Sequence, residues 1–324
     1  MKAVICKQFG PPEELVIVNV DNLIAGENQI VIDIKAAAVT FPDALIIQDK
    51  YQYKAKLPFI PGGEISGVIS QIGRRVQGFI IGDRVTGSAG QTGGFAEQLL
   101  VSATSVNKIP DSMNYAQSLG LLYTYGTAYY GLKYRSNIKL GESLLILGAA
   151  GGVGSAAIEL GKLMGARVIA AASSEKKLAM CKSLGADDVI NYSRENLKDR
   201  CKALTDGKGV NVVMDCVGGD YAEAALRGLA WDGRFLVVGF TAGVPVMPLN
   251  LALLKSCQII GVFLGAKLER DPDFKKLLTD ELTTFVSSGK LQPFISKRYS
   301  LEQAPLALND MLERKIMGRV IIEP

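Results

Sequence analysis

The chain contains no histidine. Imidazole is the side chain whose ordinary pKa lies closest to neutral pH, and it is also a common metal ligand. Its absence excludes catalytic triads built on histidine, imidazole proton relays and histidine-ligated metals. Any proton transfer must therefore use hydroxyls, carboxyls, lysine, water or the substrate itself.

Cysteine is scarce, and no two of the five cysteines form a C-x-x-C pair: Cys6, Cys181, Cys201, Cys216 and Cys257. Disulfide frameworks and structural zinc sites need close or clustered cysteines, so we expect these residues to be buried small apolar side chains in a reducing compartment. No signal-peptide pattern precedes the first expected strand, residues 2–7, which carries charge at both ends. We therefore expect a cytoplasmic protein.

A dominant charge and an uninterrupted apolar span are also missing. The net charge is +4, and the lysines and arginines are scattered rather than clustered, so we expect no nucleic-acid partner. Residues 235–254 carry no charge and could cross a bilayer by length, but glycines and prolines interrupt them. We expect no membrane span there, but a buried strand, a loop and, at residues 244–254, an apolar surface that pairs two copies in a homodimer.

The pattern of apolar residues divides the 324 residues into two kinds of structure. Up to about residue 114, short strands separated by turn residues predict a mainly β domain. The middle alternates apolar strands with helices, which predicts a parallel, doubly wound α/β sheet. Its strands are expected at residues 144–147, 167–172, 188–190, 210–215, 234–238 and 259–262, and a tail after the sheet is expected to return to the first domain.

Residues 144–154, LLILGAAGGVG, predict a strand, a tight turn and the start of a helix. Ala149, Gly151 and Gly154 occupy the three small-residue positions of the G-x-G-x-x-G fingerprint, which lays a pyrophosphate on a helix N-terminus. After the next strand, Ser173 stands where a carboxylate would bind the ribose of NAD, and Lys177 follows. A hydroxyl and an ammonium suit a 2′-phosphate, which favours NADPH. The alternative is an ordinary helix start with its lysines in solvent.

These motifs resemble the zinc-independent quinone oxidoreductases of the medium-chain dehydrogenase/reductase superfamily. The resemblance covers nearly the whole chain, including LPFIPGGEISGVI, GDRVTG, GGFAEQLLV, GADDVINY, DCVGG and ERKIMGRVII. It implies a Rossmann-type dinucleotide-binding domain at residues 119–265 and a mainly β, GroES-like catalytic domain at residues 1–118 and 266–324. The family signature is met by Gly141, Glu142, Leu145, Ala149, Ala150, Gly151, Gly152, Gly154 and Lys162, with Glu159 in place of the usual glutamine.

The zinc-bearing relatives carry metal ligands around a G-H-E segment and four cysteines in a loop. Here Gly62, Gly63 and Glu64 occupy the first region, and residues 87–94 contain no cysteine. Neither metal site is expected, so a mechanism that polarises the substrate with zinc is not expected either.

The resemblance also implies which residues bind the coenzyme. For two of them, Tyr130 and Phe263, the alternative is that the aromatic ring packs in the core and does not contact the coenzyme. The full set is Thr127 and Tyr130 at the nicotinamide pocket, Gly151, Gly152, Val153 and Gly154 at the pyrophosphate, Ser173, Lys177, Tyr192 and Arg314 at the adenosine and its phosphate, and Val217, Gly239, Phe240, Phe263, Leu264 and Gly265 near the nicotinamide.

On the substrate side the family commonly has an asparagine, an aspartate three residues later and a tyrosine further on. Thr40, Asp43 and Tyr51 occupy these places as candidate catalytic residues, and Leu45 replaces a tyrosine found in some members. Thr40 can donate one hydrogen bond but lacks the second donor of an amide. Tyr51 could alternatively be a surface-loop tyrosine beside Tyr53.

The expected activity is transfer of hydride from NADPH to a quinone or another electron-poor conjugated carbonyl compound. One alternative is a 2-enoyl or alkenal reductase that adds hydride at the β-carbon. Another is an NADPH-binding protein with a structural or regulatory role, which the loss of asparagine at Thr40 and tyrosine at Leu45 mildly favours.

Overall fold

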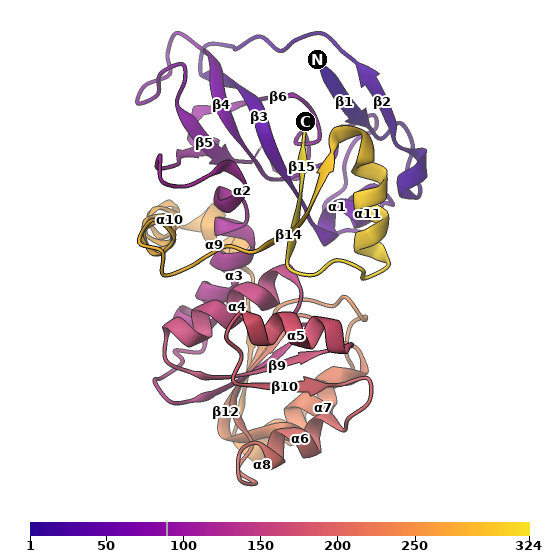
Figure 1. Cartoon of the computed structure of the whole chain (residues 1–324), viewed down its shortest axis with the longest axis vertical. Helices are drawn as coiled ribbons and strands as arrows, with labels where there is room; N and C mark the ends of the chain where they lie inside the picture. The colour runs from indigo at the N-terminus through magenta and orange to yellow at the C-terminus, as the bar shows by residue number, and fades with distance from the viewer. Residues whose placement is uncertain (89) are drawn as a thin grey trace. The chain divides into compact units, whose positions relative to one another are not determined.

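The computed structural model describes residues 1–88 and 90–324, which form two compact units (Figure 1). Unit 1 contains residues 1–120 and 292–324, and unit 2 contains residues 121–291. The chain passes from unit 1 to unit 2 after residue 120, whereas we expected this boundary after residue 118. It returns to unit 1 after residue 291, whereas we expected the return after residue 265, so residues 266–291 group with unit 2.

Unit 1 is built on antiparallel strands. A seven-stranded sheet runs in the order β14-β15-β3-β4-β5-β7, with β6 also paired to β3, and β1 and β2 form a separate pair. The expected return of the tail holds for residues 292–324, where β15 pairs with β3 and β14 pairs with β15, but not for the preceding residues 266–291. Its strands are β1 (Lys2–Ile5), β2 (Val16–Asn19), β3 (Gln29–Val39), β4 (Ile65–Ile72), β5 (Arg84–Gly87), β6 (Gln98–Ser102), β7 (Val106–Lys108), β14 (Ile295–Ser300) and β15 (Arg319–Glu323), and its α-helices are α1 (Phe41–Ile46), α2 (Tyr115–Ser118) and α11 (Ala304–Leu312).

Alternation of apolar residues along these strands produces the core of unit 1. Ile30 and Ile32 of β3 point to the same side as each other and are fully buried, together with Ile65 and Ile69 of β4. Leu308 of α11 belongs to the same buried cluster, so the C-terminal helix closes the core that the first strands begin.

Unit 2 contains a six-stranded parallel sheet in the order β10-β9-β8-β11-β12-β13. The order reverses direction between β8 and β11, as in the doubly wound Rossmann architecture, and this confirms the expected fold class. The strands are β8 (Ser143–Leu147), β9 (Arg167–Ala172), β10 (Asp188–Asn191), β11 (Val210–Asp215), β12 (Leu229–Val237) and β13 (Gln258–Gly261); the α-helices are α3 (Gly126–Tyr129), α4 (Gly152–Leu163), α5 (Glu175–Ser183), α6 (Leu197–Ala203), α7 (Asp220–Gly228), α8 (Asn250–Lys255), α9 (Leu264–Arg270) and α10 (Pro272–Ser287).

Helices cover both faces of this sheet because its strands are apolar on both sides. Leu145 and Ile169 share a core cluster with Cys201 of α6 and Leu226 of α7. On the other face α4 lies so close that a Cβ on Gly161 would stand 2.9 Å from side-chain atoms of Leu144 and Val168. Only glycine allows this approach of helix to sheet.

Residues 266–291 join unit 2 because α10 packs on the segment that opens this unit. That segment is a helix with two π-helical stretches, η3 (Leu121–Tyr125) and η4 (Tyr130–Arg135), on either side of α3. Lys133 forms an ion pair with Glu281 of α10 at 2.7 Å, and the rings of Tyr134 and Phe274 meet edge to face with centroids 4.9 Å apart. Side-chain packing across about 150 residues of sequence is not visible in a local apolar pattern.

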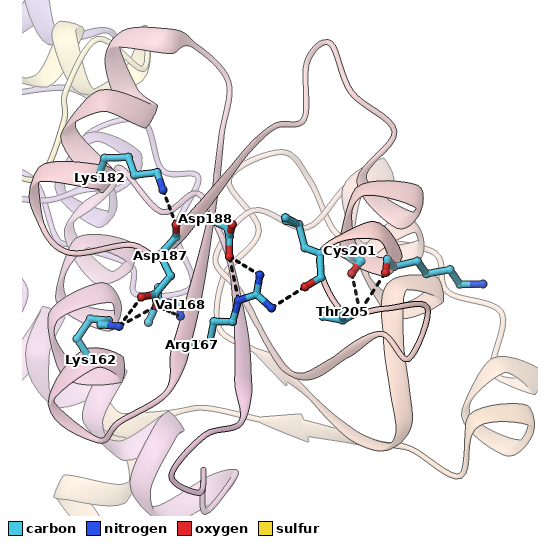
Figure 2. A network of polar contacts seen from close by, with 10 residues as sticks. Lys162, Arg167, Val168, Lys182, Asp187, Asp188, Cys201 and Thr205 are labelled. Carbon is cyan, nitrogen blue, oxygen red and sulfur yellow. Dashed lines mark hydrogen bonds and ion pairs between the residues drawn. The ribbon is translucent and has the colours of Figure 1, made fainter.

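Charged side chains fix the amino-terminal ends of β9 and β10 (Figure 2). Lys162 of α4 pairs with Asp187 at 2.6 Å, and Arg167 pairs with Asp188 at 2.9 Å. A second Asp187 oxygen accepts the backbone N–H of Val168 at 2.7 Å. The basic residue of the family signature therefore holds α4 against the first residues of two neighbouring strands.

Among the described residues, no helix is long and apolar enough to cross a membrane. The uncharged stretch at residues 235–254 contains the end of β12, a loop and the short helix α8. The strand and loop were expected, whereas α8 was expected only as an apolar surface.

Candidate functional site

The turn between β8 and α4 has the shape that the glycine fingerprint requires. Gly148 adopts a positive φ of 67°, so the chain turns sharply one residue before the first fingerprint position. A Cβ on Gly154 would stand 2.7 Å from the Cα of Ala149, which only glycine avoids. Gly151 is the N-cap of α4, so the first-turn amides of Gly152 and Val153 come directly after the turn. These amides have no acceptor within the helix and can bind an anion.

The loop after β11 packs beside this turn at the carboxyl edge of the sheet. Val217, after β11, lies 2.8 Å from where a Cβ on Gly148 would be. The buried Asp215 holds this loop, because its carboxylate accepts the N–H groups of Val217 at 2.8 Å and Gly218 at 2.9 Å. Burial raises the pKa of Asp215, while the two backbone donors lower it. Asp215 was not among the predicted site residues, although it stands in the DCVGG motif.

The expected adenosine side lies at the ends of β9 and β10. Ser174 caps α5 by accepting the N–H of Lys177 at 3.4 Å. Ser173 and Lys177 are both half-buried rather than fully solvated. The ring of Tyr192, after β10, packs against Tyr221 of α7 with centroids 4.5 Å apart and the ring planes tilted by 46°. Sequence reasoning missed Tyr221, because nothing local in α7 distinguishes it from a surface tyrosine.

All predicted coenzyme residues except one lie in unit 2, and most follow the carboxyl ends of its parallel strands. Arg314 is the exception: it is an exposed residue of unit 1, at a positive φ of 57° just after α11. Thr127 and Tyr130 lie on the α3–η4 segment, where the Tyr130 ring packs on Phe274 with centroids 5.7 Å apart. That contact fits the core-packing alternative for Tyr130. Phe263 is 64% exposed, so it is not a core aromatic within this chain.

The glutamate that departs from the family signature has a specific partner. Glu159 on α4 accepts a hydrogen bond from the hydroxyl of Tyr125 in η3. The carboxylate thereby links the coenzyme-side helix to the segment that carries Thr127. A glutamine at this position could accept the same hydrogen bond, but without charge.

In unit 1, Thr40 and Asp43 are directly bonded at the start of α1. The Asp43 oxygen Oδ2 accepts the Thr40 hydroxyl at 2.6 Å and the Thr40 backbone N–H at 2.7 Å. Burial raises the pKa of Asp43 to about 6, although Thr40 and the amides of Gly63 and Gly62 lower it. The one hydroxyl proton of Thr40 therefore points at Asp43, and not at an external acceptor, in this arrangement.

The negative charge of Asp43 also acts on Tyr51. Burial raises the pKa of Tyr51, and the negative charge of Asp43 raises it further. The hydroxyl is therefore held protonated and can serve as a hydrogen-bond donor.

Glu64 is a buried carboxyl that the sequence did not single out as functional. Its Oε1 accepts the N–H of Gly120 at 2.9 Å, while Oε2 is buried with no hydrogen-bond partner among the described residues. Burial raises the pKa of Glu64 to about 7, against the lowering effects of Gly120 and of the buried Arg319. Unit 1 thus contains two carboxyls, Asp43 and Glu64, that change protonation near neutral pH.

Comparison with known proteins gives consistent matches over the whole chain. Residues 26–111 match the alcohol dehydrogenase GroES-like domain family, and residues 152–283 match the zinc-binding dehydrogenase family. Within the described residues, no group of three or more cysteine, aspartate or glutamate side chains could hold a metal ion.

The quinone oxidoreductase-like protein 2 homolog of Nematostella vectensis is 39% identical over 99% of this chain and 88% of that protein. The Escherichia coli quinone oxidoreductase, solved in complex with NADPH, has a TM-score of 0.90 at 27% identity, with full coverage of both chains. The CurK enoyl reductase has a TM-score of 0.86 at 26% identity, covering 99% of this chain and 98% of that one. The chain therefore belongs to the quinone oxidoreductase family of the medium-chain dehydrogenase/reductase superfamily.

Proposed function

We propose that the protein is an NADPH-dependent reductase that transfers hydride to a quinone or another electron-poor conjugated carbonyl compound. The observation that carries this proposal is the carboxyl edge of the parallel sheet. There a glycine turn opens α4, and β9 beside it is followed by Ser173 rather than by a carboxylate. The NADPH complex of the Escherichia coli relative supports the same coenzyme.

The residues of unit 2 fit a dinucleotide phosphate. The amides at the start of α4 are placed for the pyrophosphate, and Gly154 leaves room for the turn to approach it. Ser173 and Lys177 supply a hydroxyl and an ammonium for the 2′-phosphate. When bound, NADPH supplies the hydride, and the protein contributes position and electrostatic stabilisation.

We assign the acceptor side to Tyr51, Thr40 and Asp43. Hydride addition to a quinone leaves a hydroquinone anion, which one proton neutralises. Tyr51 is the proposed donor of the hydrogen bond to the developing oxyanion, since its raised pKa keeps it protonated. Thr40, bonded to Asp43, positions the start of α1 and offers its oxygen lone pairs. No metal is needed in this scheme, because the charge on the oxyanion is delocalised over the aromatic ring.

A second candidate is reduction of an activated carbon–carbon double bond. The similarity to the CurK enoyl reductase supports this second candidate. After hydride addition at the β-carbon, the carbon next to the carbonyl must receive a proton. This reaction therefore depends more on a positioned proton donor than quinone reduction does.

We further propose that the enzyme is a cytosolic homodimer. The cysteines of the described residues are all free, which suits a reducing compartment, although Cys216 and Cys257 are only partly buried and not fully buried as expected. Strand β13 lies at the edge of its sheet, and the neighbouring α8 exposes Leu253 at 80% and Leu254 at 64%. An unpaired strand edge beside exposed apolar side chains is the kind of surface that a second copy covers.

The test is turnover of a panel of quinones, enones and 2-enoyl thioesters with NADPH, followed by the loss of coenzyme absorbance and by product identification. Formation of hydroquinone supports the leading proposal. Saturation of the enone double bond, without quinone turnover, would favour the second candidate. Tight NADPH binding without turnover of any class would indicate a binding protein and would overturn both.

A further inference from the structure

The ends of β9 and β10 bring two loops together at the expected adenosine site. Parallel pairing sets Asn191 of β10 opposite Ala172 of β9. The register continues one residue beyond the strands, because the Tyr192 N–H donates to the Ala172 carbonyl at 3.2 Å. Ser173 therefore leaves β9 next to the turn that carries Arg194.

A buried asparagine fixes both loops. Asn191 is only 4% exposed, and its side-chain Nδ2 donates to Oε1 of Glu175, in the first turn of α5, at 2.7 Å. Its Oδ1 accepts the N–H of Ser193 at 3.2 Å, and its carbonyl accepts the N–H of Arg194 at 3.0 Å. The backbone of Arg194 and the carboxylate of Glu175 are thus held on the same residue.

The side chain of Arg194, in contrast, is held loosely. Its Nη1 lies 4.0 Å from Oε1 of Glu175, and the two side chains are 76% and 72% exposed. At the opposite end of the same two strands, the Lys162–Asp187 and Arg167–Asp188 pairs close to 2.6 and 2.9 Å (Figure 2). An exposed ion pair at 4.0 Å contributes little, so the guanidinium can exchange partners at small cost.

We propose that Arg194 is a specificity-determining residue that binds the 2′-phosphate of the coenzyme, exchanging its loose contact with Glu175 for the phosphate. The inference rests on the proposed use of NADPH and adds to it a second cation, on a different loop from Lys177. A planar guanidinium binds a phosphate through two parallel hydrogen bonds, which an ammonium cannot do. Glu175, held by Asn191 in the first turn of α5, is the neighbouring carboxylate whose charge opposes the phosphate.

The experiment measures binding of 2′,5′-ADP and 5′-AMP by calorimetry to the full-length protein. These two ligands differ only in the 2′-phosphate, and neither needs catalytic turnover. Arg194→Ala should weaken 2′,5′-ADP binding about tenfold and leave 5′-AMP within about twofold, with partial recovery in Arg194→Lys. Glu175→Gln keeps an oxygen for Asn191 but removes the charge, so it should tighten 2′,5′-ADP binding about threefold.

Arg227→Ala and Glu223→Gln provide matched controls, because these residues form an exposed arginine–glutamate pair on α7. They should change neither ligand's affinity. If Arg194→Ala leaves a wild-type preference for 2′,5′-ADP intact, Arg194 has no role and the inference is overturned, while the proposed coenzyme stands. If the unmodified protein binds both ligands equally, the inference and the proposed NADPH preference both fail.

Discussion

Replacing Glu64 with glutamine should change how stability depends on pH, because Glu64 is buried and titrates near neutrality. Its pKa rises from 4.5 in the unfolded chain to about 7 in the folded protein. The folded protein therefore holds this proton more tightly than the unfolded chain does. That contribution to stability is fully present below about pH 4.5 and is lost as the pH rises through about 7.

The size of the effect follows from the shift. Each unit of pKa difference corresponds to about 1.4 kcal/mol, so ionising Glu64 in the folded state costs about 3 kcal/mol. Glutamine has no proton to lose. The unfolding free energy of Glu64→Gln, minus that of the unmodified protein, should therefore increase by about 3 kcal/mol between about pH 4.5 and about pH 8.

The assay is urea unfolding followed by far-ultraviolet circular dichroism at a series of pH values. Asp43→Asn is the control, because its pKa of about 6, raised from 3.8, places its window at lower pH. A stability difference for Glu64→Gln that stays constant from about pH 5 to about pH 8 would refute the reasoning, since it would mean that Glu64 does not titrate there.

Three further outcomes are expected. Lys177→Ala should weaken NADPH binding by about 1.5–3 kcal/mol and change NADH binding little, because it removes a charge-assisted contact to the 2′-phosphate; titration of both coenzymes checks this, and equal losses would contradict it. Tyr51→Phe should lower kcat/KM for enones more than for quinones, by up to about 3 kcal/mol if the hydroxyl is well aligned; unchanged values for both substrates would leave water as the proton source. Exhaustive treatment with a chelator should leave turnover and Tm unchanged, and a stoichiometric metal in the active protein would overturn the metal-free scheme.

The sequence predicted the elements whose residues are apolar on both sides or strictly alternating. Strands β9 and β11 begin and end where their patterns predicted. The tail was expected to return to the first domain as a whole, but only residues 292–324 do so. Short helices were among the elements missed; for example, α1 has a proline at its second residue, and α8 lies inside a run of apolar residues with prolines. In both, short length and tertiary contacts outweigh the local pattern.

The candidate site was predictable where a single motif dictates backbone geometry. Gly154 is an example, because its spacing in the fingerprint implies the close approach that the structure contains. Asp215, Tyr221 and Glu64 were missed because their roles depend on partners brought near by folding. The donor expected at Thr40 illustrates the same limit: the hydroxyl is present, but its proton is directed at Asp43 three residues away.

The most direct test of the central claim is steady-state reduction of a simple quinone by the purified protein, with NADPH and NADH compared at equal concentration. The account predicts hydroquinone formation with a kcat/KM for NADPH at least about tenfold above that for NADH, since the 2′-phosphate adds charge-assisted contacts that NADH lacks. Equal use of the two coenzymes, or no consumption of NADPH with any quinone, would contradict it.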